Sequence, residues 1–272
     1  MEIKTVYAVY YSATGKTRRI ATILSNAIAV ALEVPLEIVD YTAPIDREKE
    51  YSFGPTDLVI FASPTYAGKL PNKLLSFVQT AFAGNGALAV PVVTFGNRSY
   101  DNSLAELAAS LENSGFHTVA AGAFACEHAF SKTLAKGRPD AEDLRKLGEL
   151  GAAIVGKIGR MNEPCEPVAV PGDASAPYYV PKGLDGEPKM FLKAVPKTNE
   201  KCFKCGLCAQ LCPMGSISFE NFTDITGVCI KCHACVKECP TGAKYFDDEA
   251  FLSHKAMLER DFMRRAENEI FY

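Results

Sequence analysis

The chain has 272 residues, of which 48% are hydrophobic and 22% are charged, so its composition excludes a disordered or collagen-like protein. Its 29 Lys and Arg residues nearly balance its 32 Asp and Glu residues, and the net charge of −3 does not favour binding to nucleic acid or to an anionic membrane. No stretch approaches the roughly 20 apolar residues of a membrane span, and the beginning of the chain follows a strand pattern rather than that of a signal peptide. We therefore expect a cytoplasmic protein of two modest domains without membrane insertion.

Residues 1–160 alternate short apolar runs with segments of helical periodicity. Five runs are apolar on both faces, as parallel strands covered by helices are: 5–10, 36–39, 58–62, 88–95 and 118–125. Four other segments have helical periodicity: 17–32, 71–83, 103–113 and 141–158. This alternation predicts an α/β fold with a doubly wound, five-stranded parallel sheet. Ligands of such sheets bind beyond the carboxyl ends of the strands, so the loops that follow the strands form the candidate site.

The loop between the first strand and the first helix is suited to hold a phosphate. It consists of Ser12, Ala13, Thr14, Gly15, Lys16 and Thr17. Backbone N–H groups and the helix dipole both favour an anion at a helix N-terminus. The alternative is a Ser/Thr helix cap without a ligand. A nucleoside-triphosphate loop is not expected, because GxxxxGKT requires a glycine where this chain has Tyr10.

Two further loops are suited to a planar, amphipathic ring, which needs an aromatic face to stack on and a backbone that glycine leaves free to turn. The loop after the third strand contains Pro64, Thr65, Tyr66, Ala67 and Gly68. The loop after the fourth strand contains Gly96, Asn97, Arg98, Tyr100 and Asp101. After the fifth strand come Glu127 and His128, whose role stays open between the cofactor and a capped helix start.

Residues 161–200 read as a linker with extended pieces. The segment holds seven prolines and three glycines, and this density excludes long helices and central strands: Pro164, Pro167, Pro171, Pro177, Pro181, Pro188 and Pro196 with Gly172, Gly183 and Gly186. It also contains Tyr178 and Tyr179, so we expect part of it to pack on a domain.

Eight of the ten cysteines form the pattern CxxCxxCxxxCP twice. This is the spacing of bacterial ferredoxins with two [4Fe–4S] clusters, in which the fourth cysteine of each run binds the other cluster. One cluster is then expected on Cys202, Cys205, Cys208 and Cys239, and the other on Cys212, Cys229, Cys232 and Cys235. The alternative metal is zinc, but its structural sites usually use two separated CxxC pairs.

The segment after the cysteines, 247–272, is rich in helix formers and predicts a C-terminal helix packed on the core. The expected organisation is therefore an N-terminal domain over 1–160, the linker over 161–200, a small α+β cysteine domain over 201–246, and this helix.

The SxTGxT pattern of residues 12–17 resembles the phosphate loop of flavodoxins, and the two ring loops resemble their isoalloxazine loops. The whole chain resembles fused flavodoxin–ferredoxin proteins, which implies FMN and two [4Fe–4S] clusters as cofactors. Two features depart from the family: Lys16 replaces a small polar residue, and residues 1–160 carry 16 basic and 16 acidic residues where an acidic surface is usual.

The resemblance implies an electron-transfer protein that relays electrons between the clusters, FMN and an external redox partner protein. The alternative is an FMN-dependent reductase of a small organic substrate or acceptor, fed by its own ferredoxin domain. A redox sensor is a third class, but the sequence shows no output or DNA-binding element. The two domains could meet within one chain or across a homodimer.

Overall fold

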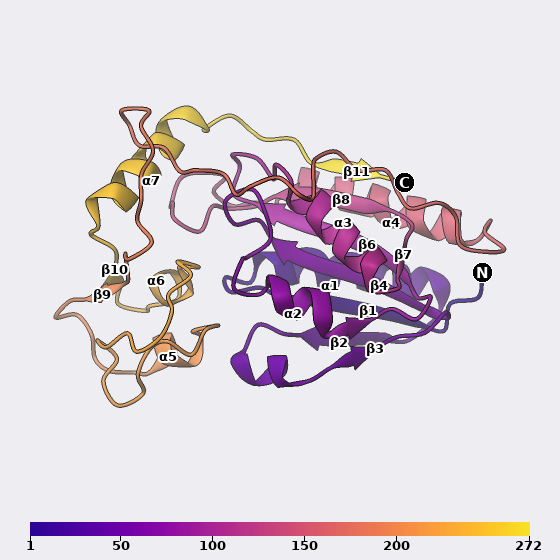
Figure 1. Ribbon diagram of the computed structural model, residues 1–272, viewed down its shortest axis with the longest axis horizontal. Helices are drawn as coiled ribbons and strands as arrows, with labels where there is room; N and C mark the ends of the chain where they lie inside the picture. The colour runs from indigo at the N-terminus through magenta and orange to yellow at the C-terminus, as the bar shows by residue number, and fades with distance from the viewer.

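The computed structural model describes all 272 residues. Its central sheet contains five parallel strands in the order β2-β1-β4-β6-β8, with bounds β1 (Thr5–Tyr10), β2 (Leu36–Asp40), β4 (Asp57–Pro64), β6 (Leu88–Phe95) and β8 (Ala121–Ala125). The chain moves outward from β1 in both directions, which is the doubly wound arrangement. The expected α/β fold with a parallel sheet is confirmed (Figure 1).

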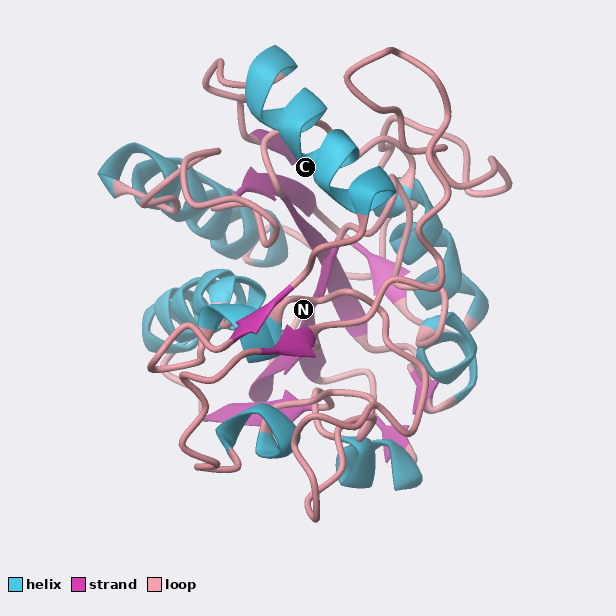
Figure 2. Cartoon of the chain, turned by 90° about the vertical axis from the view of Figure 1, so that its left-hand side faces the viewer, coloured by secondary structure: helices cyan, strands magenta, loops and turns pink.

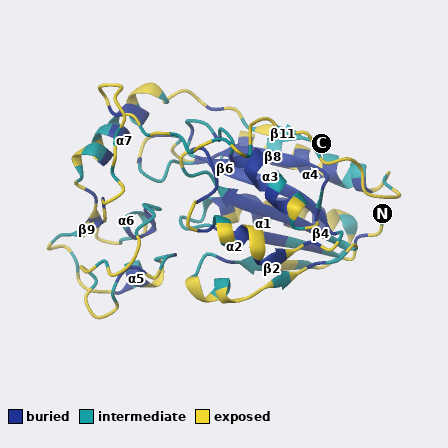
Figure 3. Ribbon diagram, in the orientation of Figure 1, coloured by how far each residue is buried: buried dark blue, intermediate teal, exposed yellow.

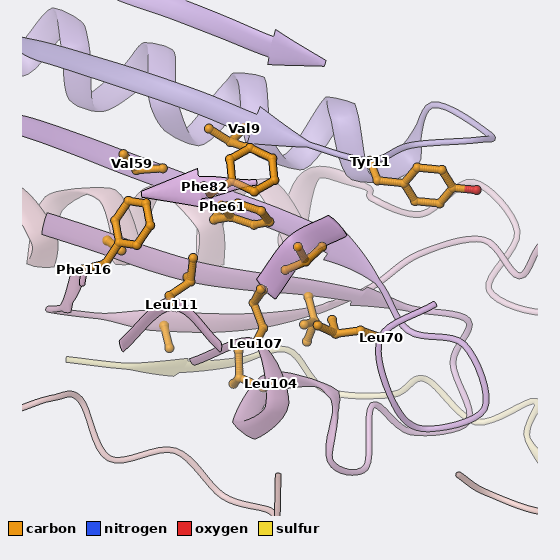
Figure 4. Close-up of a cluster of buried hydrophobic side chains, with 14 of the residues drawn as sticks. Val9, Tyr11, Val59, Phe61, Leu70, Phe82, Leu104, Leu107, Leu111 and Phe116 are labelled. Atoms are coloured by element: carbon orange, nitrogen blue, oxygen red, sulfur yellow. The ribbon is translucent and has the colours of Figure 1, made fainter. Parts of the chain in front are cut away.

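Helices cover both faces of the sheet (Figure 2). On one face α1 (Lys16–Leu32) packs with α4 (Ala141–Ile158) over a core of 23 buried residues. On the other face lie α2 (Leu75–Thr80) and α3 (Ser103–Asn113), over a core of 24 buried residues that is rich in aromatic side chains (Figure 4). Because both faces are covered, the sheet is almost fully buried (Figure 3).

Two expected elements are shorter than the sequence pattern indicates. The helix over 71–83 is confined to α2, because Phe82–Ala83 forms a strand (β5) that pairs with Tyr51–Ser52 (β3), beside the short 3₁₀ helix η1 (Pro44–Glu48). The run over 118–125 is divided into β7 (His117–Thr118) and β8, and both pair with β6. Apolar periodicity does not distinguish such short strands from the elements beside them.

The cysteine-rich region, residues 197–246, lies beyond the carboxyl ends of the parallel strands (Figure 1). It contains two antiparallel strands, β9 (Lys197–Thr198) and β10 (Lys244–Tyr245), and two single-turn helices, α5 (Leu207–Gln210) and α6 (Ala234–Lys237). Its few buried apolar residues form only small clusters. A region with so little apolar core needs other stabilisation, and bound metal commonly supplies it.

The C-terminal segment corrects the expectation of one helix over 247–272. The helix α7 covers only Glu249–Asp261, and Glu269–Phe271 forms a strand, β11, that pairs antiparallel with β8. The sheet therefore has an antiparallel edge strand in addition to the five parallel ones. β11 covers the backbone groups that β8 would otherwise expose at the edge of the sheet.

The linker, residues 161–200, contains no helix and packs along the N-terminal domain, as expected. The buried Lys69 ammonium forms an ion pair with Glu106 (2.9 Å) and also donates to the carbonyl oxygens of Ala174 (2.6 Å) and Ala176 (2.9 Å). The Tyr178 hydroxyl donates to the Leu70 carbonyl at 2.9 Å. The linker is thus bound to the domain by its backbone. No helix in the chain combines the length and the apolar character that crossing a membrane requires.

Candidate cofactor-binding site

The loop over residues 12–17 offers a row of backbone donors. Gly15 adopts a left-handed conformation (φ = 77°) just before α1, and the Ser12 hydroxyl accepts a hydrogen bond from the Arg18 N–H at 2.9 Å. The loop N–H groups that donate to no acceptor in the chain are those of Ala13, Thr14, Lys16 and Thr17. Free N–H groups at a helix N-terminus match an anionic ligand, so the loop fits the phosphate of a flavin mononucleotide.

Tyr11 and Tyr66 mark the next part of the site. Tyr11 is fully buried just beyond the end of β1, and its hydroxyl has no hydrogen-bond partner (Figure 4). Burial raises the pKa of Tyr66 well above its ordinary value, and the nearby Cys232 raises it further. Burial also raises the pKa of Tyr11, again with contributions from Tyr66 and Cys232. Tyr66 and, from the cysteine-rich region, Met214 and Ile230 pack against the core that contains Tyr11.

Gly68 lets the loop after β4 turn back. It has φ = 77°, and a Cβ there would lie 2.4 Å from the Asp101 carboxylate, so only glycine fits against the neighbouring loop. The Thr65 N–H donates to the Thr94 carbonyl of β6 at 2.7 Å, which joins the two loops.

All the hydrogen-bonding capacity of the Asn97 side chain is taken up by partners within the chain. Its amide donates to the carbonyl oxygens of Phe262 and Arg264, both at 2.6 Å. Its oxygen accepts from the Ala266 N–H (3.2 Å) and from Arg138 (3.4 Å). We expected Asn97 to contact the cofactor, but this amide has no capacity left, and only the backbone is available.

The Tyr100 side chain is also held by the C-terminal segment. The ring is buried, and its hydroxyl donates to the Glu269 carboxylate of β11 at 2.8 Å. The structure therefore does not place Tyr100 as the second aromatic wall that the sequence suggested. Arg98 forms an ion pair with Asp101 and stacks on the ring of Tyr179 at 3.9 Å, so the linker also contacts this loop.

The loop after β8 contributes residues to both parts of the molecule. The His128 ring covers Gly96 so closely that a Cβ there would lie 2.2 Å from its Cδ2 atom. Burial lowers the pKa of His128 to about 3, with contributions from His254 and Lys237, so the imidazole is neutral at physiological pH. Glu127 forms an ion pair with Lys237 of the cysteine-rich region. The structure places His128 against Gly96 of a ring loop and Glu127 at the contact between the two parts.

Two cavities in the cysteine-rich region are each lined by four cysteines. The inner cavity is lined by Cys212, Cys229, Cys232 and Cys235. The outer cavity is lined by Cys202, Cys205, Cys208 and Cys239. In each, three cysteines come from one run and the fourth from the other run, which is the grouping that the spacing predicts.

The surroundings of the cysteines suit a cluster better than a single ion. The spacing also favours clusters over zinc, because structural zinc sites usually use two separated CxxC pairs. Backbone N–H groups donate to both fourth cysteines in equivalent positions: Ser216 to Cys212 (3.3 Å) and Ala243 to Cys239 (3.2 Å). Such hydrogen bonds to sulfur are typical of iron–sulfur sites.

The inner cavity is the one beside the N-terminal domain. Arg47 donates to the Pro213 carbonyl, next to Cys212. Met214 and Ile230 pack against the apolar core of that domain. By contrast, Cys205 of the outer cavity is exposed. Another pocket lies elsewhere, between α4 and the C-terminal residues, and none of the candidate residues lines it.

Comparison with known protein families agrees with the division of the chain into an N-terminal α/β domain and a cysteine-rich region. The family model of the flavodoxin domain matches residues 7–123, and that of the 4Fe-4S binding domain matches residues 195–218 and 223–245. The chain is a fused flavodoxin–ferredoxin. The N-terminal domain is thus a flavodoxin domain, and the cysteine-rich region is a ferredoxin region. They imply FMN and two [4Fe–4S] clusters, and they support an electron-transfer flavo-iron–sulfur protein.

Solved structures similar to the chain include an archaeal flavodoxin (17% identity, TM-score 0.39), which matches over 58% of this chain and 100% of that one. A Streptococcus flavodoxin matches at 20% identity and TM-score 0.38, over 56% of this chain and 99% of that one. The flavodiiron core from Synechocystis matches at 18% identity and TM-score 0.39, over 58% of this chain and 37% of that one. The comparison with curated proteins gave no match.

Proposed function

We propose that the protein relays electrons between an external one-electron redox partner, the two clusters and FMN. One observation supports this most strongly: the inner cavity adjoins the flavodoxin domain, because its lining residues Met214 and Ile230 pack against the core that contains Tyr11, and Arg47 donates to the Pro213 carbonyl. FMN accepts or gives one or two electrons and each cluster exchanges one, so the chain can collect or divide electron pairs.

The proposed binding residues follow the geometry above. The free N–H groups of residues 12–17 would bind the FMN phosphate, and the loops over 64–68 and 96–101 would bind the ring, with Asn97 contributing only its backbone. The four inner cysteines would bind one cluster and the four outer cysteines the other. Electrons would enter or leave through the outer cluster, since the exposed Cys205 lies there.

The alternative, an FMN-dependent reductase of a small organic substrate, needs space for that substrate above the flavin and a proton donor. Neither is favoured by the contacts. The Tyr179 N–H donates to the Ala67 carbonyl at 2.8 Å, so the linker covers part of a ring loop, and Met214 and Ile230 of the ferredoxin region pack against the core that contains Tyr11. We therefore prefer the relay. All ten cysteines are unpaired, which is consistent with our inference of a reducing, cytoplasmic location.

The domain division that we propose assigns 1–160 to FMN, 161–200 to the linker and 201–246 to the clusters. Residues 247–272 connect the ferredoxin region back to the flavodoxin sheet through β11. Both ends of the ferredoxin region are thus attached to the flavodoxin domain, and linkage of this kind raises the effective concentration of each cofactor for the other.

An anaerobic potential-controlled titration of the fully loaded protein tests the relay. Flavin absorbance and the EPR signals of the clusters are recorded together as the potential is lowered. For a relay, we expect flavin absorbance to change in one-electron steps within the potential range of the clusters. A single two-electron change outside that range would contradict the relay and support the reductase.

A further inference from the structure

The two cysteine repeats differ at a position that both hold in the left-handed conformation. In the first repeat this residue is Gly206 (φ = 80°), which precedes α5. In the second repeat it is His233 (φ = 62°), which precedes α6. Glycine adopts this conformation freely, whereas a residue with a Cβ does not. The backbone therefore favours glycine at position 233, and the histidine side chain must contribute something that glycine cannot.

The His233 ring belongs to a row of aromatic side chains that connects the two parts of the molecule. Its centroid lies 4.6 Å from that of Phe246, with the planes at 12°, and 4.7 Å from that of Phe130. Phe130 follows β8, and its ring centroid lies 5.0 Å from that of His128. His128 in turn covers Gly96 on a ring loop. The row thus runs from the flavin loops to the inner cavity.

His233 also lines the inner cavity together with its four cysteines. The residue is only 5% exposed, and its Nε2 atom has no hydrogen-bond partner in the chain. Buried polar atoms nearly always have a partner, so an unpaired one at a cavity indicates that the partner is what the cavity holds. Gly206 offers the outer cavity no equivalent side-chain donor.

We propose that His233 couples the inner cluster to FMN: its ring docks on Phe130, and its Nε2–H donates a hydrogen bond to a sulfur of that cluster. The inference rests on the proposed relay. It assigns electron transfer between the two domains to the inner cluster, with His233 as the positioning residue.

The cofactors already implied supply and accept all the electrons of this step. Each transfer would move one electron from the reduced inner cluster to FMN, and two such transfers with two protons from water would complete the two-electron reduction of FMN. The external one-electron partner reduces the clusters again. A hydrogen bond to sulfur stabilises the more negative, reduced cluster, so His233 makes the inner cluster the easier one to reduce. Electron transfer can also proceed in the opposite direction, from reduced FMN to the inner cluster.

Two substitutions separate the roles of the ring and the donor. His233→Gly reproduces the backbone of the first repeat and removes both the ring and Nε2. His233→Asn keeps a residue that tolerates the left-handed conformation and keeps an N–H donor, but it removes the ring. The matched control is Lys204→Gly, because Lys204 is also left-handed (φ = 60°), is exposed and lies beside the outer cavity.

Iron and FMN content, the midpoint potential of each cluster, and the rate of flavin reduction after photoreduction of the clusters are measured for each loaded variant. We expect His233→Gly to keep both clusters, to shift one cluster potential to a more negative value and to slow flavin reduction. His233→Asn should shift the potential less and slow flavin reduction as well. Lys204→Gly should leave the potential of the inner cluster and this rate unchanged.

Unchanged potentials and rate in His233→Gly would overturn the proposal, and so would an equal shift of both clusters. If that variant does not retain its clusters, Phe130→Leu replaces it, since Phe130 lies outside the cysteine repeats. A rate in Phe130→Leu equal to that of the original protein would also overturn the docking role. Failure of the relay itself would be distinct, because the unsubstituted protein would then show no electron exchange between clusters and flavin.

Discussion

At the scale of single residues, the groups that the loop over 12–17 leaves free for a ligand include neutral hydroxyl and backbone N–H groups. The side-chain hydrogen bonds within the loop are made by Ser12 and by Thr17, whose hydroxyl lies 2.7 Å from that of Thr94. The Thr14 hydroxyl makes no such bond within the chain, so it is free to donate to a ligand. Recognition by hydroxyl and backbone groups explains how an anion can be held in a domain whose formal charges sum to zero.

We predict that Thr14→Val weakens FMN binding and leaves iron content unchanged. A hydrogen bond to a charged group contributes about 1.5–3 kcal/mol, so affinity should fall roughly ten- to a hundredfold. Fluorescence titration of the deflavinated protein with FMN measures this. Thr22→Val on the same helix is the control, because the Thr22 hydroxyl donates to the Arg18 carbonyl and points away from the loop N–H groups. Equal affinities of the two variants would mean that the phosphate loop is misassigned.

His128 gives the stability of the fold a pH dependence. Burial, His254 and Lys237 lower its folded-state pKa to about 3, whereas an unfolded histidine titrates near 6.5. Between these values the unfolded chain binds more protons than the folded chain, so stability is lost as the pH falls below about 6.5. His128→Gln should reduce the slope of the unfolding free energy against pH in this window by up to about 1.4 kcal/mol per pH unit. Denaturant titrations at several pH values measure it, and identical slopes would contradict the prediction.

At the scale of elements, the C-terminal segment determines the shape of the second ring loop. Asn97 binds three backbone groups of that segment, and Asn268 accepts a hydrogen bond from the Ala125 N–H of β8 at 2.9 Å. Behind them lies the buried Arg138–Asp143 ion pair. Burial alone would raise the pKa of Asp143, but hydrogen bonds from Arg138 and Asn268 hold it below its usual value, so the carboxylate stays charged. A flavin loop is thus fixed by residues far away in the sequence.

Asn97→Gly should release this segment without straining the backbone, since Asn97 itself is left-handed (φ = 70°). Losing four hydrogen bonds, two of them buried and two partly buried, should destabilise the fold by about 2–4 kcal/mol. Hydrogen exchange should become faster at residues 262–271 before it changes in β1 or β4. Glu33→Gly is the control, because Glu33 is left-handed too (φ = 56°) but lies at the end of α1. Unchanged exchange at 262–271 in Asn97→Gly would contradict the proposed anchoring.

At the scale of the whole molecule, the sequence predicted elements that depend on neighbouring residues, but it did not predict contacts between residues far apart in the chain. The five parallel strands depend on residues close together in sequence, so apolar periodicity was sufficient to predict them. The partners of Asn97 and Tyr100 in the C-terminal segment lie 165 to 169 positions away, and no local signal reveals them. The same holds for β11, whose three residues continue a helix-forming composition but pair with β8. Tertiary pairing overrides local propensity in such short segments.

The placement of the outer cavity supports a prediction for the molecule as a whole. It is lined only by residues of the ferredoxin region, from Cys202 to Lys244, whereas the region beside the inner cavity contacts the flavodoxin domain. Cys208→Ala should therefore remove or convert the outer cluster and leave FMN and the inner cluster bound. Iron and flavin analysis with EPR of the reduced variant measures this. Reduction by an external protein donor should be lost, while direct photoreduction of FMN continues. If flavin is lost as well, the cluster that Cys208 binds stabilises the contact between the two domains, and the cofactor sites are interdependent.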